Sequence, residues 1–198
     1  EHPGELTLVA LGPLTNVALA TRLDPDLPNK YRELVIMGGA VYAMGNTETR
    51  SAEFNIFYDP DAAHIVFSEW LNITMLSWEA TAENPLTLEQ TNTLSAISTP
   101  RGEFFHKITR AQIAMIRNFL GVETLFIPDP LAMAVAIEPE RVITRSERHY
   151  VQLELSGYST RGQTVVDWRD RLGKTANTTI VISVDMQRVY ELMRQGLE

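Results

Sequence analysis

The alternation of short apolar runs with helical patterns constrains the fold of this chain more than any other feature. Residues 6–11, 33–40 and 72–78 are apolar runs bounded by turn residues, which is typical of buried strands. Between them, residues 14–23 and 59–70 carry apolar side chains at helical spacing. This order of elements predicts an α/β layered architecture, with a mostly parallel central sheet flanked by helices.

The second half of the chain predicts further helices and three closely spaced strands. Residues 86–120 are mostly helical in pattern, with a break at 99–102. The remaining predicted elements are helix 129–137, strands 149–155, 163–168 and 179–184, and an amphipathic helix over 185–194. Because three strands follow one another with little helix between them, we expect the sheet to be mixed.

Composition limits the classes of function. The 198 residues, 44% of them hydrophobic, suit one globular domain over residues 1–198. The net charge of −8, without a basic cluster, argues against nucleic acid as a partner. No apolar run is long enough to span a membrane. Cysteine is absent, which excludes disulfides and thiolate chemistry. We expect a cytoplasmic protein, although these observations leave secretion open.

Polar side chains gather in the segments that follow the predicted strands. In open α/β sheets, ligands bind outside the carboxyl ends of the strands. Asn46, Glu53 and Asn55 lie in such a segment, and Gly38 and Gly39 would let the backbone approach a small molecule. Together these groups donate and accept hydrogen bonds in the way that a polyol such as a sugar requires.

Two Asp-Pro dipeptides have a simpler interpretation. Asp59 and Asp129 each precede a proline at a predicted helix start, and helix capping alone would explain both aspartates. An unrelated α/β domain whose Asp-Pro pairs serve only as caps therefore remains one reading of the sequence.

Several motifs, in order along nearly the whole chain, resemble the nucleoside hydrolases, the inosine–uridine-preferring N-ribohydrolase family. They are LVALGPLTNVALA, ELVIMGGA, GN followed by AEFNIFYDPDAAHIVF, DPLAMAVAIEP and TRGQTVVD. The resemblance implies that Asn46, Glu53 and Asn55 hold the ribose hydroxyls, and that Met37 lines the sugar pocket. The activity it implies is hydrolysis of the N-glycosidic bond of ribonucleosides.

The resemblance also implies one bound Ca²⁺. Thr15 in GPLTN matches a residue that gives its backbone carbonyl to the ion, and Asp129 in PDPLA matches a side-chain ligand. Relatives of this family often form dimers or tetramers, so the resemblance leaves a homo-oligomer possible here.

Two departures from the family pattern matter for activity. The family opens with an Asp-x-Asp motif and a further Asp-Asp that supply the remaining metal ligands and the catalytic base, and this sequence has no counterpart. We therefore expect a domain that is N-terminally incomplete and inactive by itself. Pro128 occupies the position where members often carry His, or Trp in a purine-specific branch, and proline cannot protonate a leaving base. The alternative function is a catalytically dead nucleoside- or sugar-binding relative or subunit.

Overall fold

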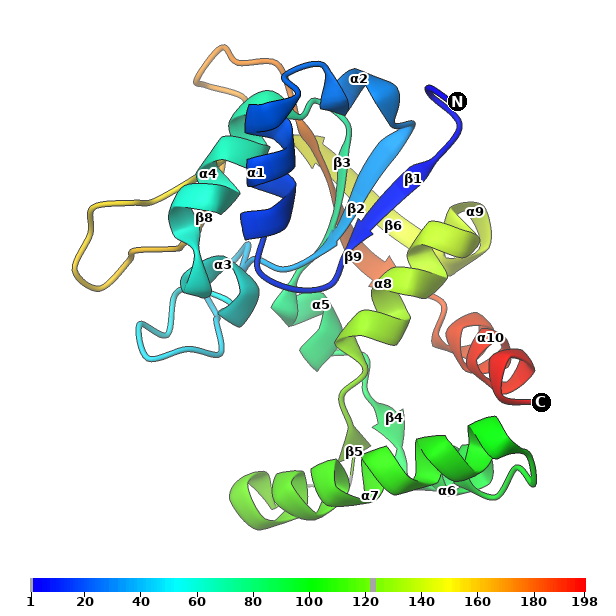
Figure 1. Ribbon diagram of the computed structural model, residues 1–198. Coiled ribbons are helices and arrows are strands. Elements are labelled where there is room, and N and C mark those ends of the chain that lie inside the picture. The colour runs from blue at the N-terminus through cyan, green and yellow to red at the C-terminus, as the bar shows by residue number, and fades with distance from the viewer. Residues whose placement is uncertain (1, 122–123) are drawn as a thin grey trace.

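The computed structural model describes residues 2–121 and 124–198. Its centre is a five-stranded sheet with the strand order β1-β2-β3-β9-β6 (Figure 1). The strands are β1 (Thr7–Ala10), β2 (Glu33–Met37), β3 (Ile73–Leu76), β9 (Thr178–Val184) and β6 (Ile143–His149). The first four pair in parallel, and β6 pairs antiparallel with β9. The predicted α/β architecture with a mixed sheet is therefore confirmed.

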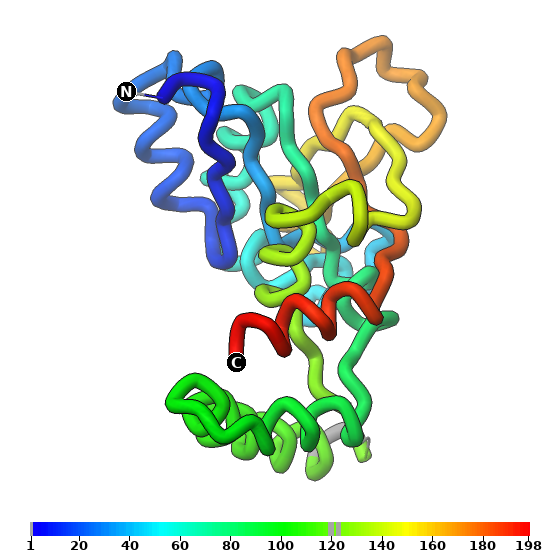
Figure 2. The backbone as a smooth tube through the Cα atoms, turned by 90° about the vertical axis from the view of Figure 1, so that its right-hand side faces the viewer, coloured from blue at the N-terminus to red at the C-terminus, as the bar shows by residue number. Residues whose placement is uncertain are grey.

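The helices cover both faces of this sheet. The helices of the body that carries this sheet are α1 (Thr15–Leu23), α2 (Leu27–Lys30), α3 (Phe54–Tyr58), α4 (Pro60–Glu69), α5 (Trp78–Ala82), α8 (Pro128–Ile137), α9 (Pro139–Val142) and α10 (Met186–Leu197). In Figures 1 and 2, α1 and α4 lie on one face, and α8 lies on the other with α10 beyond it.

The alternation of side chains along β2 explains how both faces are filled. Leu34 and Ile36 belong to the apolar cluster under α1 and α4, whereas Val35 and Met37 belong to the cluster under α8 and α10. Successive residues of a strand point to opposite faces, so a strand covered on both faces needs a continuous apolar run. This requirement accounts for the sequence ELVIM.

The C-terminal strands differ from the prediction in two ways. β7 (Val151–Leu153) and β8 (Thr164–Val166) do not join the central sheet but form a separate antiparallel ribbon, with β7 against α4. The buried Asn177 side chain joins this ribbon to the body, since it exchanges hydrogen bonds with the Val151 backbone and donates to the Phe67 carbonyl. The fifth sheet strand is instead β6, whose polar sequence ITRSERH suits an exposed edge and hides its strand character.

The segment between α5 and α8 lies at one end of the molecule. It comprises β4 (Leu86–Thr87), α6 (Leu88–Ser95), α7 (Pro100–Leu120) and β5 (Thr124–Leu125), and β4 pairs antiparallel with β5 (Figure 1). The predicted break is real: Thr99 caps α7 by accepting from the Gly102 amide, and Pro100 occupies its first turn. None of the helices described is long and apolar enough to cross a membrane.

Candidate functional site

The candidate site residues lie at the carboxyl end of the parallel strands. α1 follows β1, the loop over residues 38–53 follows β2, and α5 follows β3, while α8 begins near the same end (Figure 1). This is the edge at which ligands bind in open α/β sheets. Elements that are distant in sequence thus bring their polar residues to one region.

Glu53 is buried at the start of α3 and is only 2% exposed. Its carboxylate caps the helix by accepting from the Asn55 amide at 2.9 Å and the Ile56 amide at 3.3 Å. It also accepts from the Gly39 amide at 3.1 Å, which fixes the beginning of the loop after β2. Glu53 therefore organises the backbone of the region as well as supplying a carboxylate to it.

The environment of Glu53 shifts its ionisation strongly. Burial raises the pKa of its carboxyl to about 7, because the charged form loses hydration, although its three backbone donors pull the pKa down. The charge of Asp129 adds to the increase in the pKa of Glu53. This contribution indicates that the fold brings the two carboxylates toward each other, although 76 positions (129 − 53) separate them in sequence.

Asn55 and Met37 contact each other directly. The Asn55 side-chain amide donates to the Met37 carbonyl at 3.0 Å and lies 3.4 Å from its sulfur. The Asn55 side-chain oxygen accepts no hydrogen bond from the residues that the structure describes, and Asn55 is 8% exposed. This oxygen is available to a ligand hydroxyl.

Asn46 lies further out and is exposed. Its side-chain oxygen accepts from the Phe54 amide at 2.9 Å, which places it beside the start of α3. Asn46, Arg50 and the aromatic rings of Phe54 and Tyr58 help to line an open pocket of about 510 Å³. The Asn46 side chain thus lies beside the backbone that joins Glu53 to Asn55, but it faces a more open surface.

The two Asp-Pro dipeptides prove to be different. Asp59 caps α4 by accepting from the Ala62 amide at 3.0 Å, and it also accepts from the Thr15 hydroxyl at the start of α1. Asp129 caps nothing: α8 has Ile127 as its N-cap, and no side chain accepts from its first turn. The capping interpretation is therefore confirmed for Asp59 and wrong for Asp129, because Pro128 starts the helix one residue earlier.

Asp129 presents a carboxylate with no structural partner among the residues described. It is exposed in the first turn of α8, yet the protein atoms on its inner side raise the pKa of its carboxyl through desolvation. It helps to line a pocket of about 520 Å³ with Pro128 and apolar side chains such as Phe126. The carboxylate is therefore accessible to a ligand or an ion.

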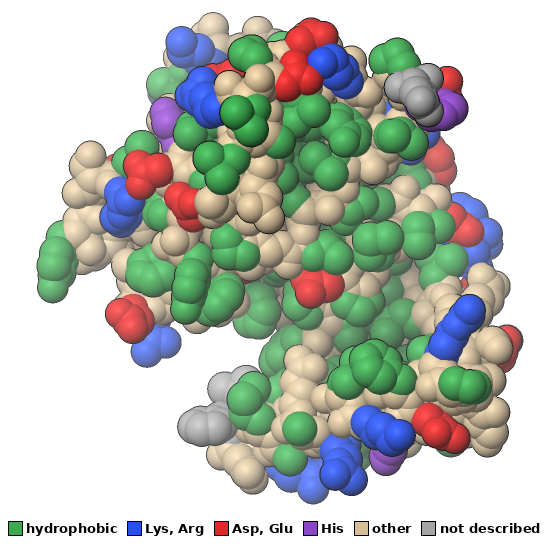
Figure 3. All heavy atoms as spheres, viewed as in Figure 1, with side chains coloured by type: hydrophobic (Ala, Val, Ile, Leu, Met, Phe, Trp, Pro, Cys, Tyr) green, Lys and Arg blue, Asp and Glu red, His purple; other side chains and the backbone are tan. Residues whose placement is uncertain are grey.

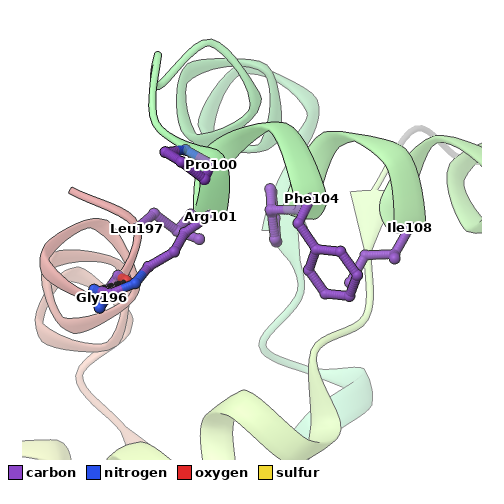
Figure 4. A pocket seen from close by; sticks show the side chains of 7 residues that line it. Pro100, Arg101, Phe104, Ile108, Gly196 and Leu197 are labelled. Carbon is purple, nitrogen blue, oxygen red and sulfur yellow. Dashed lines mark hydrogen bonds between the residues drawn. The ribbon is translucent and has the colours of Figure 1, made fainter.

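A second apolar pocket of about 480 Å³ shares residues with the one at Asp129. Figure 4 shows Phe104 and Ile108 of α7 on one side of it and Gly196 and Leu197 of α10 on another. In Figure 3 hydrophobic side chains line the hollow between the body and the segment that carries α7. The pocket at Asp129 therefore continues onto an apolar surface.

The residues described hold no ready-made cluster of acidic metal ligands. They include no group of three or more His, Cys, Asp or Glu residues placed to hold a metal ion. Ca²⁺ takes six to eight oxygen ligands, and of the predicted ligands only Asp129 offers a charged oxygen. Thr15 lies in the first turn of α1, and its hydroxyl is engaged with Asp59. The assignment of Thr15 and Asp129 as metal ligands remains a prediction.

Sequence reasoning missed one buried acid in this region. Glu79 of α5 is 4% exposed and accepts from the amides of Val41, Tyr42 and Met44. Ser77, a good N-cap, is followed two residues later by an acid, which is a helix-start signal, but the apolar run over residues 72–78 predicts a strand there.

Comparisons with known proteins identify the family of the chain. The family model described as inosine-uridine preferring nucleoside hydrolase matches residues 1–191. The chain is 34% identical to the pyrimidine-specific ribonucleoside hydrolase RihB of Shigella flexneri, covering 97% of this chain and 60% of that protein. It is also 34% identical to the inosine-uridine preferring nucleoside hydrolase of Crithidia fasciculata, covering 100% of this chain and 61% of that protein.

Solved structures give the same result. A plant nucleoside hydrolase superposes with a TM-score of 0.87 at 28% identity, covering 98% of this chain and 62% of that one. An inosine–guanosine nucleoside hydrolase superposes with a TM-score of 0.86 at 35% identity, covering 95% and 60%. The chain belongs to the inosine-uridine preferring nucleoside hydrolase family, and it spans about 60% of the length of the curated relatives it matches.

Proposed function

We propose that residues 1–198 form the ribose-binding part of a nucleosidase that hydrolyses the N-glycosidic bond of ribonucleosides to ribose and free base. The observation that carries this proposal is the set of contacts that joins Met37, Asn55 and the buried Glu53 at the carboxyl end of β2. Family membership supports the reaction class. We further propose Asn46, Glu53, Asn55 and Met37 as the residues that bind the sugar.

The chemistry of the reaction suits these residues. Cleavage of a glycosidic bond passes through a state in which the sugar ring gains positive charge. Carboxylates held near the ring stabilise that charge, and fixed donors and acceptors orient the hydroxyls. Asn55 offers a free carbonyl oxygen for a hydroxyl, and Asp129 offers an accessible negative charge. Pro128, which has no donor, leaves protonation of the base to other groups or to water.

Calcium is the cofactor that we propose for the active protein, with the Asp129 carboxylate and the Thr15 carbonyl among its ligands. Because the residues described include no cluster of acidic side chains for this ion, we propose that the 198-residue chain is inactive by itself. The negative net charge supports a small-molecule substrate rather than nucleic acid as the partner. We also propose that the protein forms a homo-oligomer and is located in the cytoplasm.

The test is ribose release from inosine and uridine by the complete product of the open reading frame that encodes these residues. The proposal expects turnover that a chelator abolishes and Ca²⁺ restores. It also expects Asn55→Leu, which removes the free carbonyl oxygen, to weaken substrate binding. Nucleoside or ribose binding without any turnover would instead support the catalytically dead binding relative.

A further inference from the structure

Glu79 packs beneath residues 38–46, the first part of the long loop that follows β2, and the loop means these residues from here on. Its carboxylate accepts from the Val41 amide at 3.1 Å, the Tyr42 amide at 2.9 Å and the Met44 amide at 3.3 Å. No basic side chain among the described residues pairs with it, although it is only 4% exposed. A buried carboxylate without a cation is stable only where donors converge on it, and here every donor belongs to this loop.

The backbone conformation of the loop directs several amides toward one point, where an anion is favourable. Ala43, between two of the bonded amides, has a φ of 58°, a left-handed conformation that is unfavourable for residues with a Cβ. Successive amides turned inward by such a conformation form a concave anion site. Glu79 fills this site from within the protein, so its charge offsets the unfavourable backbone conformation at Ala43.

The same loop connects the proposed sugar-binding residues. At its beginning, the Gly39 amide donates to Glu53 at 3.1 Å. At its end lies Asn46, which accepts from the Phe54 amide at 2.9 Å. The stretch between these two anchors is held by Glu79. Glu79 therefore fixes the path of residues 41–44, which leads from the Gly39 anchor to Asn46.

We infer that Glu79 is a positioning residue, which holds the loop over residues 38–46 so that Asn46 reaches the sugar. This inference rests on the proposed function, because it assigns Asn46 to ribose. Glu79 touches no substrate in this arrangement and acts through the backbone amides. A displacement of about 1 Å in a substrate-positioning group can lower turnover about 100-fold.

Amide hydrogen exchange tests the first half of the inference and does not depend on activity. In the 198-residue chain, the Val41, Tyr42 and Met44 amides are expected to be protected. Glu79→Gln keeps the size of the side chain but removes its charge, so these three amides should exchange about 10-fold faster or more. The control is Glu83→Gln, an exposed glutamate at the end of the same helix, which should leave them unchanged.

Two outcomes of the exchange experiment are decisive. Unchanged protection of the three amides in Glu79→Gln would overturn the inference. If that variant does not fold, Glu79→Asp is the substitute, since it keeps the charge but withdraws it by one methylene. Faster exchange confined to the same three amides is then expected, and wild-type exchange would again overturn the inference.

A double-mutant cycle in the complete open-reading-frame product tests the link to Asn46. Glu79→Gln and Asn46→Ala should each lower kcat/KM for inosine by 10-fold to 100-fold, and the double variant should be no worse than Asn46→Ala. Losses that multiply would mean that Glu79 does not act through Asn46. Absence of turnover in the wild-type protein would instead reject the proposed function, and the exchange result would then decide the role of Glu79 in the loop.

Discussion

Glu53 caps α3, and its burial makes ionisation of its carboxyl unfavourable. Its carboxyl has an ordinary pKa of 4.5 and a folded-state pKa of about 7. Well below 4.5 both states hold the proton, so burial has no electrostatic cost. As the pH rises from 4.5 to 7, the unfolded chain releases its proton first, and the free energy of unfolding falls. The full loss is on the order of 3 kcal/mol.

We predict that Glu53→Gln removes this pH dependence. Urea unfolding of the 198-residue chain below and above this pH interval should show that the wild type loses more stability than the variant as the pH rises. The exposed Glu83→Gln serves as the control and should follow the wild type. Parallel pH profiles for Glu53→Gln and wild type would contradict the raised pKa of Glu53.

Pro128 takes the position at which the family resemblance implies a histidine or a tryptophan, so the proposed function leaves activation of the leaving base to another group. We predict that Pro128→His raises kcat for inosine in the complete open-reading-frame product, because histidine can donate a proton to the departing base. Stability should change little, since Pro128 is the first residue of α8 and the amide exposed there has no partner in the helix. An unchanged kcat would mean that the base leaves by another route.

At the level of elements, the loop after β2 depends on close backbone packing at Gly45. A Cβ on Gly45 would lie 2.0 Å from the Ala52 carbonyl oxygen. We predict that Gly45→Ala lowers the free energy of unfolding by roughly 1–3 kcal/mol, since the backbone must shift. Gly196→Ala is the control: its Cβ meets nothing within 4 Å inside α10, so it should be neutral or stabilise by up to about 1 kcal/mol. Equal effects in urea unfolding would contradict the packing at Gly45.

The elements that sequence patterns predicted are those whose signals are local. β1, β2, β3, α1 and α4 each combine an apolar pattern with a clear boundary residue, and the structure has all five. α3 and α5 have five residues each, too few for a helical period to be visible. β6 is stabilised by pairing with β9 and not by an apolar face, so its polar sequence gave no strand signal.

The candidate site was predictable only in part for a similar reason. Motif resemblance selected Glu53, Asn55 and Asp129, but the contacts that decide their environment are tertiary. The Asp-Pro pairs at 59 and 129 look alike in sequence, and only the helix starts distinguish them. Glu79 carries no motif, and its role follows from a loop more than thirty positions away.

Considered as one molecule, the chain has a well-packed sheet with helices on both faces, but its described residues include no metal-binding cluster. We predict that the purified 198-residue chain folds cooperatively and releases no ribose from inosine or uridine in the presence of Ca²⁺. The reason is that one accessible carboxylate near Glu53 cannot supply the oxygens that the ion requires. Ribose release above the buffer background would contradict this prediction.

The most direct test of the proposed site is the kcat for inosine of Asp129→Asn in the complete open-reading-frame product. Because Asp129 caps no helix, the substitution removes a charge that the first turn of α8 favours by about 0.3–1 kcal/mol but that desolvation and Glu53 oppose, so stability should change little. The expected result is a loss of kcat by orders of magnitude, with a melting temperature in chelator that barely changes. Wild-type kcat in Asp129→Asn would contradict the placement of Asp129 in the active site.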